Sequence, residues 1–559
     1  MKEKLQPFNL FWLFFLMLSI LGTIRIVMFG QDVDEQYAVA MAYRMVCGDR
    51  MFLEMWEPHQ TSGFLAAVFI KLFMILTGGI DYLVIYLRVV GVVIQFIISV
   101  FLYDTMKKFF SKDVALGMAF FFYNTISKNS PVPEFTNMLL WFSVITFLCL
   151  MRFVENHNFA IKWLVLAGIF SSLLVLSYPT CILAVIPVLI GIWVVSEQKQ
   201  RLKNCAGYMG TCACCGIAYL LYFLSHMSIA EFMFGFGQMC TDGSHSATLL
   251  NKLAGYVRED MLKLAPHMLI SVGMACAIWF LIMFFQHKRC DFLMCLLLSS
   301  CLEQGYVWIF QDNRLKFPSI FYFVLLVIGV FRYIKSNRLG LGEDALQYKS
   351  MFWFGSIMAL FIWIAALLTS NTYLYDTVEY TMVGLIAAIG YTEYEYKENK
   401  WWWKAVILVL LGVALFRRGY LMYYTYGKDT VFVTKQKAVS GPLAGIYCRW
   451  SEGVNYNLSS ELIKQYIPEG SNVLFVGTDV VLYLQGEQQV SNFSTICTPT
   501  FDERLYTYWE HYPKKYPEYV VWDTGIYFRP SEEMTNRLLT DCMLIAEEEN
   551  WRIYRMEAH

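Results

Sequence analysis

The chain has 559 residues, of which 57% are hydrophobic and 17% aromatic, and its formal net charge is −1. The apolar residues recur in blocks of about 20, the length of a helix that crosses a bilayer, so the sequence predicts a polytopic membrane protein. The low net charge and the lack of a basic tract argue against nucleic acid as a partner, because a phosphate backbone requires clustered Lys and Arg.

The N-terminal segment, residues 1–30, has two lysines before its apolar run. The run is longer than the core of a signal peptide and is not followed by a small-residue cleavage site. The segment therefore predicts an uncleaved first span with its N-terminus in the cytoplasm.

Thirteen further apolar blocks follow the first one. The block at 62–77 is short and carries Lys71 in its middle. If this block crossed, the loop with Lys107, Lys108 and Lys112 would face outside, against the positive-inside rule. We therefore expect a juxtamembrane or re-entrant helix there and about 13 crossings in a plasma-membrane protein. The other blocks lie near 82–103, 113–129, 134–153, 160–177, 180–196, 205–225, 267–286, 292–311, 317–334, 351–369, 377–393 and 402–418.

The composition changes after about residue 418, where Pro-, Gly- and Ser-containing turns become common. The sequence thus predicts a transmembrane domain over 1–420 and an extracytoplasmic domain over 421–559. Residues 457–477 have the pattern of a helix, a turn and a buried strand, and YPEYVVWDTG predicts another strand. The expected fold is mainly α-helical, with a small C-terminal α/β domain.

The first outer loop, within residues 31–80, is unusually rich in charge. Apolar residues recur at helical spacing from Ala38 to Val46, which predicts an amphipathic helix lying on the outer membrane surface. Asp32, Asp34 and Glu35 stand at its start. Asp32 and Glu35 have capping-box spacing, and acids at a helix N-terminus also favour the helix dipole. The further charges at Arg44, Arg50, Glu54, Glu57 and His59 favour an active-site rim instead.

An acidic pair after the first span, a surface helix and a Glu-Pro segment together resemble the GT-C membrane glycosyltransferases. The nearest branch includes the protein O-mannosyltransferases and the lipid A aminoarabinose transferase. The residues that carry the likeness are Asp34-Glu35 with Tyr37, and Glu57-Pro58-His59. The resemblance implies transfer of a sugar from a polyprenyl-phosphate donor to an acceptor outside the membrane, by inverting displacement. It assigns Asp34 as the base and Glu35 as a second catalytic acid.

The resemblance also implies residues for the donor in later outer loops. Glu134 is expected as a further catalytic acid, although it stands where a helix N-terminal charge would also be favourable. Arg314 and Lys316 are expected to bind the carrier phosphate, and snorkelling at a span end is the other interpretation. Arg25 and Arg88 either snorkel or pair with the first-loop acids.

Aromatic and polar side chains supply the remaining candidates for substrate binding. Tyr37 and His59 belong to the first loop, Tyr178 lies at an outer turn and could stack on a sugar, and Glu303 is an acid within a span, where such residues usually line a cavity. A hairpin turn is the alternative for Tyr178.

Some relatives hold a divalent metal between the Glu-Pro segment and a later histidine. The matching candidates are Glu57, His59 and His245. The chain departs from the lysine-diproline form of that segment, and these residues have no recognised ligand spacing. No cofactor is therefore certain, and a divalent metal ion stays an open alternative.

Two other classes of function remain open from sequence. A transporter or flippase of lipid-linked saccharide would have structural repeats and buried charges spread through the spans. A polysaccharide polymerase or ligase would carry its key residues in a large late loop, for which the segment 226–266 is the candidate. The sugar and the acceptor, whether lipid, glycan or protein, are not readable.

Overall fold

The computed structural model describes most of the chain, including the first loop and nearly all of the C-terminal region. The described residues are 7–126, 130–155, 161–241, 249–286, 292–310, 327, 329–331, 333–334, 344–369, 378–395, 400–424, 427–430, 432–433, 435–496, 501–525 and 530–557.

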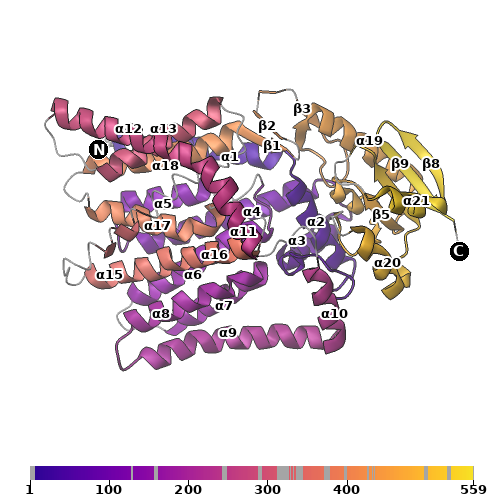
Figure 1. The fold of residues 1–559 in the computed structure, drawn as a ribbon, viewed down its shortest axis with the longest axis horizontal. Coiled ribbons are helices and arrows are strands. Elements are labelled where there is room, and N and C mark those ends of the chain that lie inside the picture. Colours follow the sequence, from indigo (N-terminus) through magenta and orange to yellow (C-terminus); the bar gives the residue numbers. More distant parts are fainter. Residues whose placement is uncertain are drawn as a thin grey trace, which may run out of the picture.

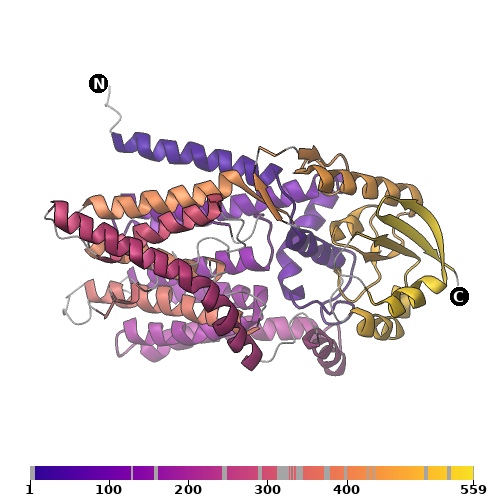
Figure 2. The same ribbon diagram turned by 45° about the horizontal axis from the view of Figure 1, so that its top comes forward.

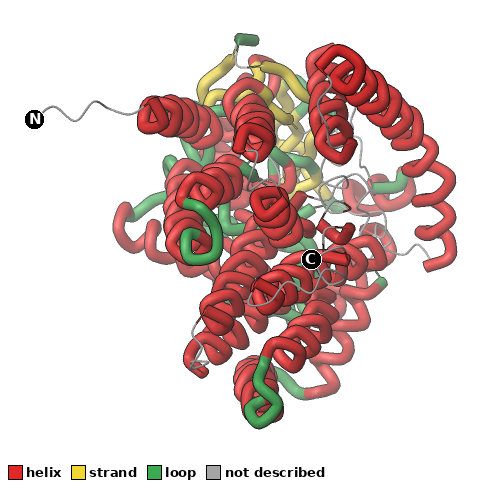
Figure 3. The backbone as a smooth tube through the Cα atoms, turned by 90° about the vertical axis from the view of Figure 1, so that its left-hand side faces the viewer, coloured by secondary structure: helices red, strands yellow, loops and turns green. Residues whose placement is uncertain are grey.

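A bundle of long helices forms one end of the molecule, and a smaller domain with a sheet forms the other (Figure 1). An end-on view shows that most of the bundle helices run roughly parallel to one another (Figure 3). The helices up to residue 310 are α1 (Pro7–Met28), α2 (Val33–Val46), η1 (Gln60–Ser62), α3 (Gly63–Thr77), α4 (Leu83–Met106), α5 (Lys112–Asn124), α6 (Phe135–Glu155), α7 (Ile161–Ser177), η2 (Pro179–Ala184), α8 (Val185–Val195), α9 (Arg201–Leu224), α10 (Ile229–Cys240), α11 (Leu249–Gly255), η4 (Tyr256–Met261), α12 (Leu262–Gln286) and α13 (Phe292–Phe310). They are followed by α15 (Asp344–Ser350), η5 (Met351–Ile357), α16 (Met358–Thr369), α17 (Val378–Glu395) and α18 (Lys400–Tyr420).

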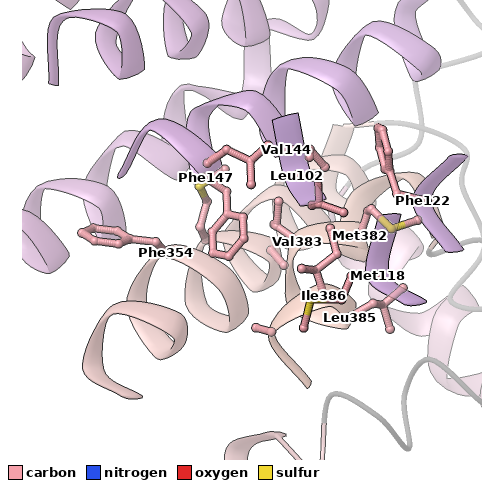
Figure 4. Packing of buried hydrophobic residues seen from close by; sticks show 14 of the residues in the cluster. Leu102, Met118, Phe122, Val144, Phe147, Phe354, Met382, Val383, Leu385 and Ile386 are labelled. Atoms are coloured by element: carbon pink, nitrogen blue, oxygen red, sulfur yellow. The ribbon is translucent and has the colours of Figure 1, made fainter. Parts of the chain in front are cut away.

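The centre of the bundle is packed by helices α4, α5, α6, η5 and α17. Helix α6 is buried along nearly its whole length, so both of its faces are apolar. Phe147 of α6, Phe354 of η5 and Val383 of α17 belong to the same buried cluster (Figure 4). Helix α1 runs along the edge of the bundle (Figure 2) and packs mainly on α18.

Seven helical segments of the described residues are long and apolar enough to cross a membrane. They are Leu10–Met28, Gln60–Thr77, Leu83–Met106, Phe135–Glu155, Arg201–Leu224, Leu250–Phe285 and Leu346–Thr369, and shorter apolar helices cover Ile161–Ser177, Pro179–Val195 and Tyr380–Tyr391. The expected multi-pass membrane protein is confirmed, and the count of about 13 crossings stays a prediction.

Helix α3 is the block for which we expected a juxtamembrane position. It packs on α2 and α4. Its other side exposes Val68, Leu72, Ile75 and Leu76 together with the central Lys71. An apolar face with a lysine in its middle suits a helix at the membrane interface, where the ammonium group reaches water. By length alone α3 also qualifies as a span, so its juxtamembrane position stays a prediction.

Helix α2 forms where the sequence predicts a helix, but its expected position on the membrane surface is wrong. All residues from Glu35 to Arg44 are buried. Helix α3 covers one side of α2, and residues 480–484 of the C-terminal region pack on it as well. Both views of the ribbon place α2 between the bundle and the sheet domain (Figures 1 and 2). The small and apolar residues of α2 therefore contact protein on more than one side.

The C-terminal region contains a mixed five-stranded sheet with the order β6-β5-β7-β9-β8. Strands β5, β6 and β7 are parallel, and β9 is antiparallel to both β7 and β8. The elements are β1 (Leu421–Tyr424), β2 (Gly427–Thr430), β3 (Lys435–Lys437), β4 (Tyr447–Arg449), α19 (Trp450–Tyr466), β5 (Asn472–Val476), η6 (Val480–Leu484), β6 (Gln489–Val490), α20 (Phe501–His511), η7 (Pro513–Lys515), β7 (Tyr519–Asp523), α21 (Glu532–Thr540), β8 (Cys542–Glu548) and β9 (Trp551–Met556).

The predicted helix, turn and buried strand are confirmed as α19, the turn at Gly470 and β5. Gly470 has a φ of 75°, a conformation that favours glycine. The second predicted strand is β7, whose residues are all buried. A continuous apolar run is typical of a parallel strand covered on both faces, which explains why both strands were readable from sequence.

Candidate active site

The candidate site begins at the N-terminus of α2. The Asp32 carboxylate accepts a hydrogen bond of 2.9 Å from the Asp34 backbone N–H and so caps the helix. Asp34 follows in the first turn and is half-buried. The capping interpretation of the acidic cluster is thus confirmed for Asp32, which leaves Asp34 as the partly accessible carboxylate of the first turn.

Glu35 is buried in an ion pair with Arg88 of α4. Arg88 Nε donates to Glu35 Oε1 at 2.7 Å, and Nη2 donates to Oε2 at 2.5 Å. The same guanidinium group donates to the carbonyls of Val27 and Gly30 at 3.2 and 2.8 Å. The expected pairing of Arg88 with a first-loop acid is therefore confirmed, and this bidentate pair fixes the chain between α1 and α2.

The loop before α6 connects Glu35 to Glu134. Ser130 donates its hydroxyl hydrogen to Glu35 Oε1. Asn137 Nδ2 donates to the carbonyls of Ser130 and Val132, at 2.7 and 2.9 Å, and so holds the loop on α6. A hydrogen-bonded loop thus links Glu35, at one end, to Glu134, at the other.

Glu134 itself is buried at the start of α6. Its carboxylate accepts hydrogen bonds from the backbone N–H groups of Thr136 and Asn137, at 2.9 and 2.7 Å. This geometry agrees with the helix-terminal role that the sequence left open, since the carboxylate satisfies N–H groups that have no partner within the helix.

His59 lies next to Glu134 in space because its ring stacks on Phe135. The two ring centroids are 4.0 Å apart and the ring planes differ by 3°. The centroid of the Tyr178 ring is 6.0 Å from that of His59 and 6.4 Å from that of Phe135. The ring of Tyr380, on α17, meets the Tyr178 ring edge-on, with 6.2 Å between the centroids. The structure therefore brings His59 and Tyr178 together in an aromatic cluster beside Glu134.

Two other predicted substrate-binding residues lie in different surroundings. Tyr37 is buried in the apolar cluster that α2 and α3 share with the C-terminal region. Glu303 of α13 pairs with His267 of α12, with 2.5 Å between Oε1 and Nδ1. Acidic residues within spans commonly pair with another polar or titratable side chain in this way.

Glu57, a candidate metal ligand, is held by α2 and by the C-terminal domain. Its Oε1 accepts hydrogen bonds from the Thr495 backbone N–H at 2.7 Å and from Arg44 Nη1 at 3.3 Å. Burial raises the pKa of the Glu57 carboxyl, and the Arg44 charge and the bonds from Thr495 oppose that shift. Within the described residues, His, Cys, Asp and Glu side chains form no group of three that could hold a metal ion.

Three candidates lie outside the described residues. They are Arg314 and Lys316, expected at the carrier phosphate, and His245, expected at a metal.

The C-terminal domain is joined to the first loop by apolar and polar contacts. Trp56 is fully buried among residues of that domain, and its backbone N–H donates to the Phe493 carbonyl at 3.0 Å. Lys515 pairs with Asp49 at 2.5 Å. Close to the start of α2, Gln31 and Gln36 donate to Asp479 Oδ1 at 2.7 and 3.0 Å.

Asp479 gives this junction a pH dependence that can be measured. Burial raises the pKa of its carboxyl from 3.8 to about 6, helped by the charge of Asp523 and opposed by bonds from Gln36 and Gln31. The folded protein thus holds the proton more tightly than the unfolded chain, so stability is lost as the pH rises from about 4 to about 6. The expected loss is about 3 kcal/mol. Thermal unfolding of the protein in detergent should show this slope, and Asp479→Asn should flatten it.

An exposed carboxylate of the same domain supplies the control for that measurement. Glu469→Gln should leave the slope as it is, because Glu469 is exposed to solvent. An unchanged slope in Asp479→Asn would show that other groups produce it.

Sequence reasoning missed the residues that support the acids. Ser130, Asn137 and Asp479 are ordinary polar residues in the sequence, and their roles depend on partners 95, 7 and 448 positions away. The segment NSPVPEFTN offered one signal, since Asn and Ser beside prolines are typical of ordered loops.

Comparison with known proteins gives one family. Residues 61–231 match the family described as dolichyl-phosphate-mannose-protein mannosyltransferase, and this segment is less than half of the chain. It includes Arg88, Ser130, Glu134 and Tyr178, whereas Asp34 and Glu35 precede it. No curated protein matches the chain.

Among solved structures, one similar chain is the archaeal oligosaccharyltransferase AglB from Archaeoglobus fulgidus, in complex with an inhibitory peptide and a dolichol-phosphate. The two chains are 11% identical, with a TM-score of 0.41 over 93% of this chain and 70% of the other. The likeness is too low to carry an argument about this site.

Proposed function

We propose that this chain is a membrane glycosyltransferase of the GT-C superfamily and that it transfers a sugar from a polyprenyl-phosphate carrier to an acceptor hydroxyl at the outer face of the membrane. The observation that carries the proposal is the family match over residues 61–231. Two residues of that segment, Arg88 and Ser130, contact Glu35 directly. The matched segment thus positions the helix terminus on which Asp34 lies.

Asp34 is the proposed general base. The acceptor oxygen attacks the anomeric carbon of the donor while the bond from that carbon to the phosphate oxygen breaks. The bonding electrons leave with the carrier phosphate, and the hydroxyl proton passes to the Asp34 carboxylate. Attack opposite the leaving group inverts the anomeric configuration. General-base assistance of this kind contributes typically ~10²–10⁴-fold to the rate.

Glu35 is proposed as a positioning residue. Both of its oxygens are bound by Arg88, and one also accepts from Ser130. Because these bonds already engage both oxygens, Glu35 is proposed to hold the chain rather than to meet the acceptor hydroxyl. The proposed task of Glu35 is to fix the first turn of α2 so that Asp34 keeps its place.

The donor is proposed to bind with its sugar beside the aromatic cluster that contains His59. His59 is half-buried beside the buried rings of Phe135 and Tyr178, and it is proposed to meet the apolar face of the sugar. Arg314 and Lys316 are proposed to bind the phosphate, because a guanidinium group can hold two phosphate oxygens at once.

The test follows the sugar in membranes that contain the protein. Polyprenyl-phosphate mannose, glucose, galactose and arabinose, each with a radioactive sugar, are supplied in turn. Transfer predicts that the label from at least one donor moves from the lipid extract into a new glycosidic product. A flippase would expose the label on the opposite leaflet and leave it on the lipid, and that outcome would overturn the proposal.

A further inference from the structure

A polar cavity lies where the C-terminal domain meets the start of the first loop. Its volume is about 450 Å³. The lining residues are Gln31 of the first loop and Trp450, Ser451, Glu452, Val454, Asn455, Thr478, Asp479, Asp523, Gly525, Glu549 and Asn550 of the domain. The neighbouring ion pairs and aromatic cluster described above are not part of it.

The sheet topology places this cavity where α/β folds bind ligands. Thr478 and Asp479 follow β5, and Asp523 and Gly525 stand at the end of β7, its parallel neighbour. The chain leaves β5 towards β6 on one side, whereas β7 lies on the other side of β5. A crevice between such oppositely directed connections at the carboxyl ends of strands is the usual ligand site of an open α/β sheet.

One buried polar atom in the cavity wall is not satisfied by the described residues. Gln31 is 3% exposed and donates through Nε2 to Asp479, but its Oε1 atom is buried without a hydrogen-bond partner there. A buried carbonyl oxygen that accepts no hydrogen bond is costly, so this atom is suited to accept a hydroxyl hydrogen from a ligand. At the rim, Trp450 keeps 55% of its surface exposed.

The lining chemistry selects the class of ligand. Four carboxylates and three amide side chains line the cavity, and among the residues that the structure describes no Lys or Arg does. Phosphate or carboxylate groups would be repelled by this negative charge, whereas sugar hydroxyls donate to carboxylates and both donate to and accept from amides. An exposed indole ring adds an apolar surface on which a sugar ring can lie. A metal ion is a poor occupant, because the described acids form no ligand group of three.

We infer that this cavity binds the acceptor of the proposed transfer as a hydroxyl-rich, non-anionic saccharide, with Trp450 against one sugar face and Asp479, Asp523 and Gln31 on its hydroxyls. The inference rests on the proposed function for the role of acceptor. Gln31 precedes Asp34 by three residues, which span at most about 11 Å of chain. An acceptor glycan of two or more sugars thus reaches from the cavity towards the proposed base.

The experiment measures glycan binding to the full-length protein in nanodiscs. The probes are immobilised manno-, gluco-, galacto- and N-acetylglucosamine oligosaccharides, with mannose 6-phosphate oligosaccharides as the anionic comparison. The wild type should bind at least one neutral probe and not the anionic one. Trp450→Ala and Asp523→Asn should weaken that binding tenfold or more. Trp193→Ala, which removes an exposed indole from the bundle helix α8, should leave it unchanged.

Asp34→Asn separates this inference from the proposed function. It should bind the probe as the wild type does while transfer is lost. The inference would be overturned if no neutral probe bound at millimolar concentration. It would equally be overturned if Trp450→Ala bound the probe as the wild type does, or if the anionic probe bound as well as the neutral one. If the wild type bound the probe but transferred sugar from none of the donors, the proposed function would be overturned, and the cavity would still be a saccharide-binding site.

Discussion

Replacement of Asp34 by Asn should reduce sugar transfer by ~10²–10⁴-fold, because the amide cannot accept the acceptor's proton. The amide is close in size to the carboxylate, and Asp34 is half-buried in the first turn of a helix whose cap is Asp32. The fold should therefore persist. The measurement is the initial rate of label transfer, together with the Kd for the donor, which should change little since the base acts only when the acceptor attacks.

Asp32→Asn is the matched control for that variant. Asparagine caps a helix about as well as aspartate, so the variant removes one negative charge two residues from Asp34 without removing the cap. Transfer within about threefold of the wild type is expected. If Asp32→Asn and Asp34→Asn lowered the rate equally, the loss would be an effect of general surface charge. If Asp34→Asn retained the wild-type rate, Asp34 would not be the base.

Much of the fold was predictable because it depends on local pattern. The apolar blocks gave the helices of the bundle, and the apolar runs at β5 and β7 gave the core of the sheet. The position of α2 was not predictable in the same way. A helix rich in Ala and Met has the same sequence pattern whether its apolar face contacts lipid or protein. Only the folded chain shows that the distant segment η6 packs on α2.

The same distinction applies to the site. Sequence identified Asp34, Glu35 and Glu134 as notable acids, and Arg88 as a possible partner for the first-loop acids. It could not predict that Arg88 would pair with Glu35 rather than with Asp34, because that choice depends on how α4 is oriented about its axis. For Glu57, the resemblance suggested a metal ligand, and the sequence could not predict that its carboxylate contacts both Arg44 and Thr495, which join the first loop to the C-terminal domain.

Removal of one partner from the buried pair of Glu35 and Arg88 should destabilise the first loop. Arg88→Met leaves the Glu35 carboxylate buried without its cation, for which the expected cost is about 3–5 kcal/mol. Thermal unfolding in detergent should show a marked fall in the midpoint for this variant. The matched control is Arg50→Met, since Arg50 pairs with Glu54 at the surface and exposed pairs contribute about 0–1 kcal/mol.

The double variant Glu35→Met with Arg88→Met separates positioning from stability. Removing both charges takes away the buried, unpaired carboxylate, so the unfolding midpoint should recover most of the way towards the wild type. The guanidinium bonds to Val27 and Gly30 and the Ser130 bond to Glu35 are lost all the same, so the first turn of α2 is less well fixed. We expect kcat to fall at least tenfold while the donor KM stays within about twofold, because a displaced base impairs the chemical step more than it impairs binding. A double variant that recovers both its midpoint and its kcat would show that the pair serves folding alone.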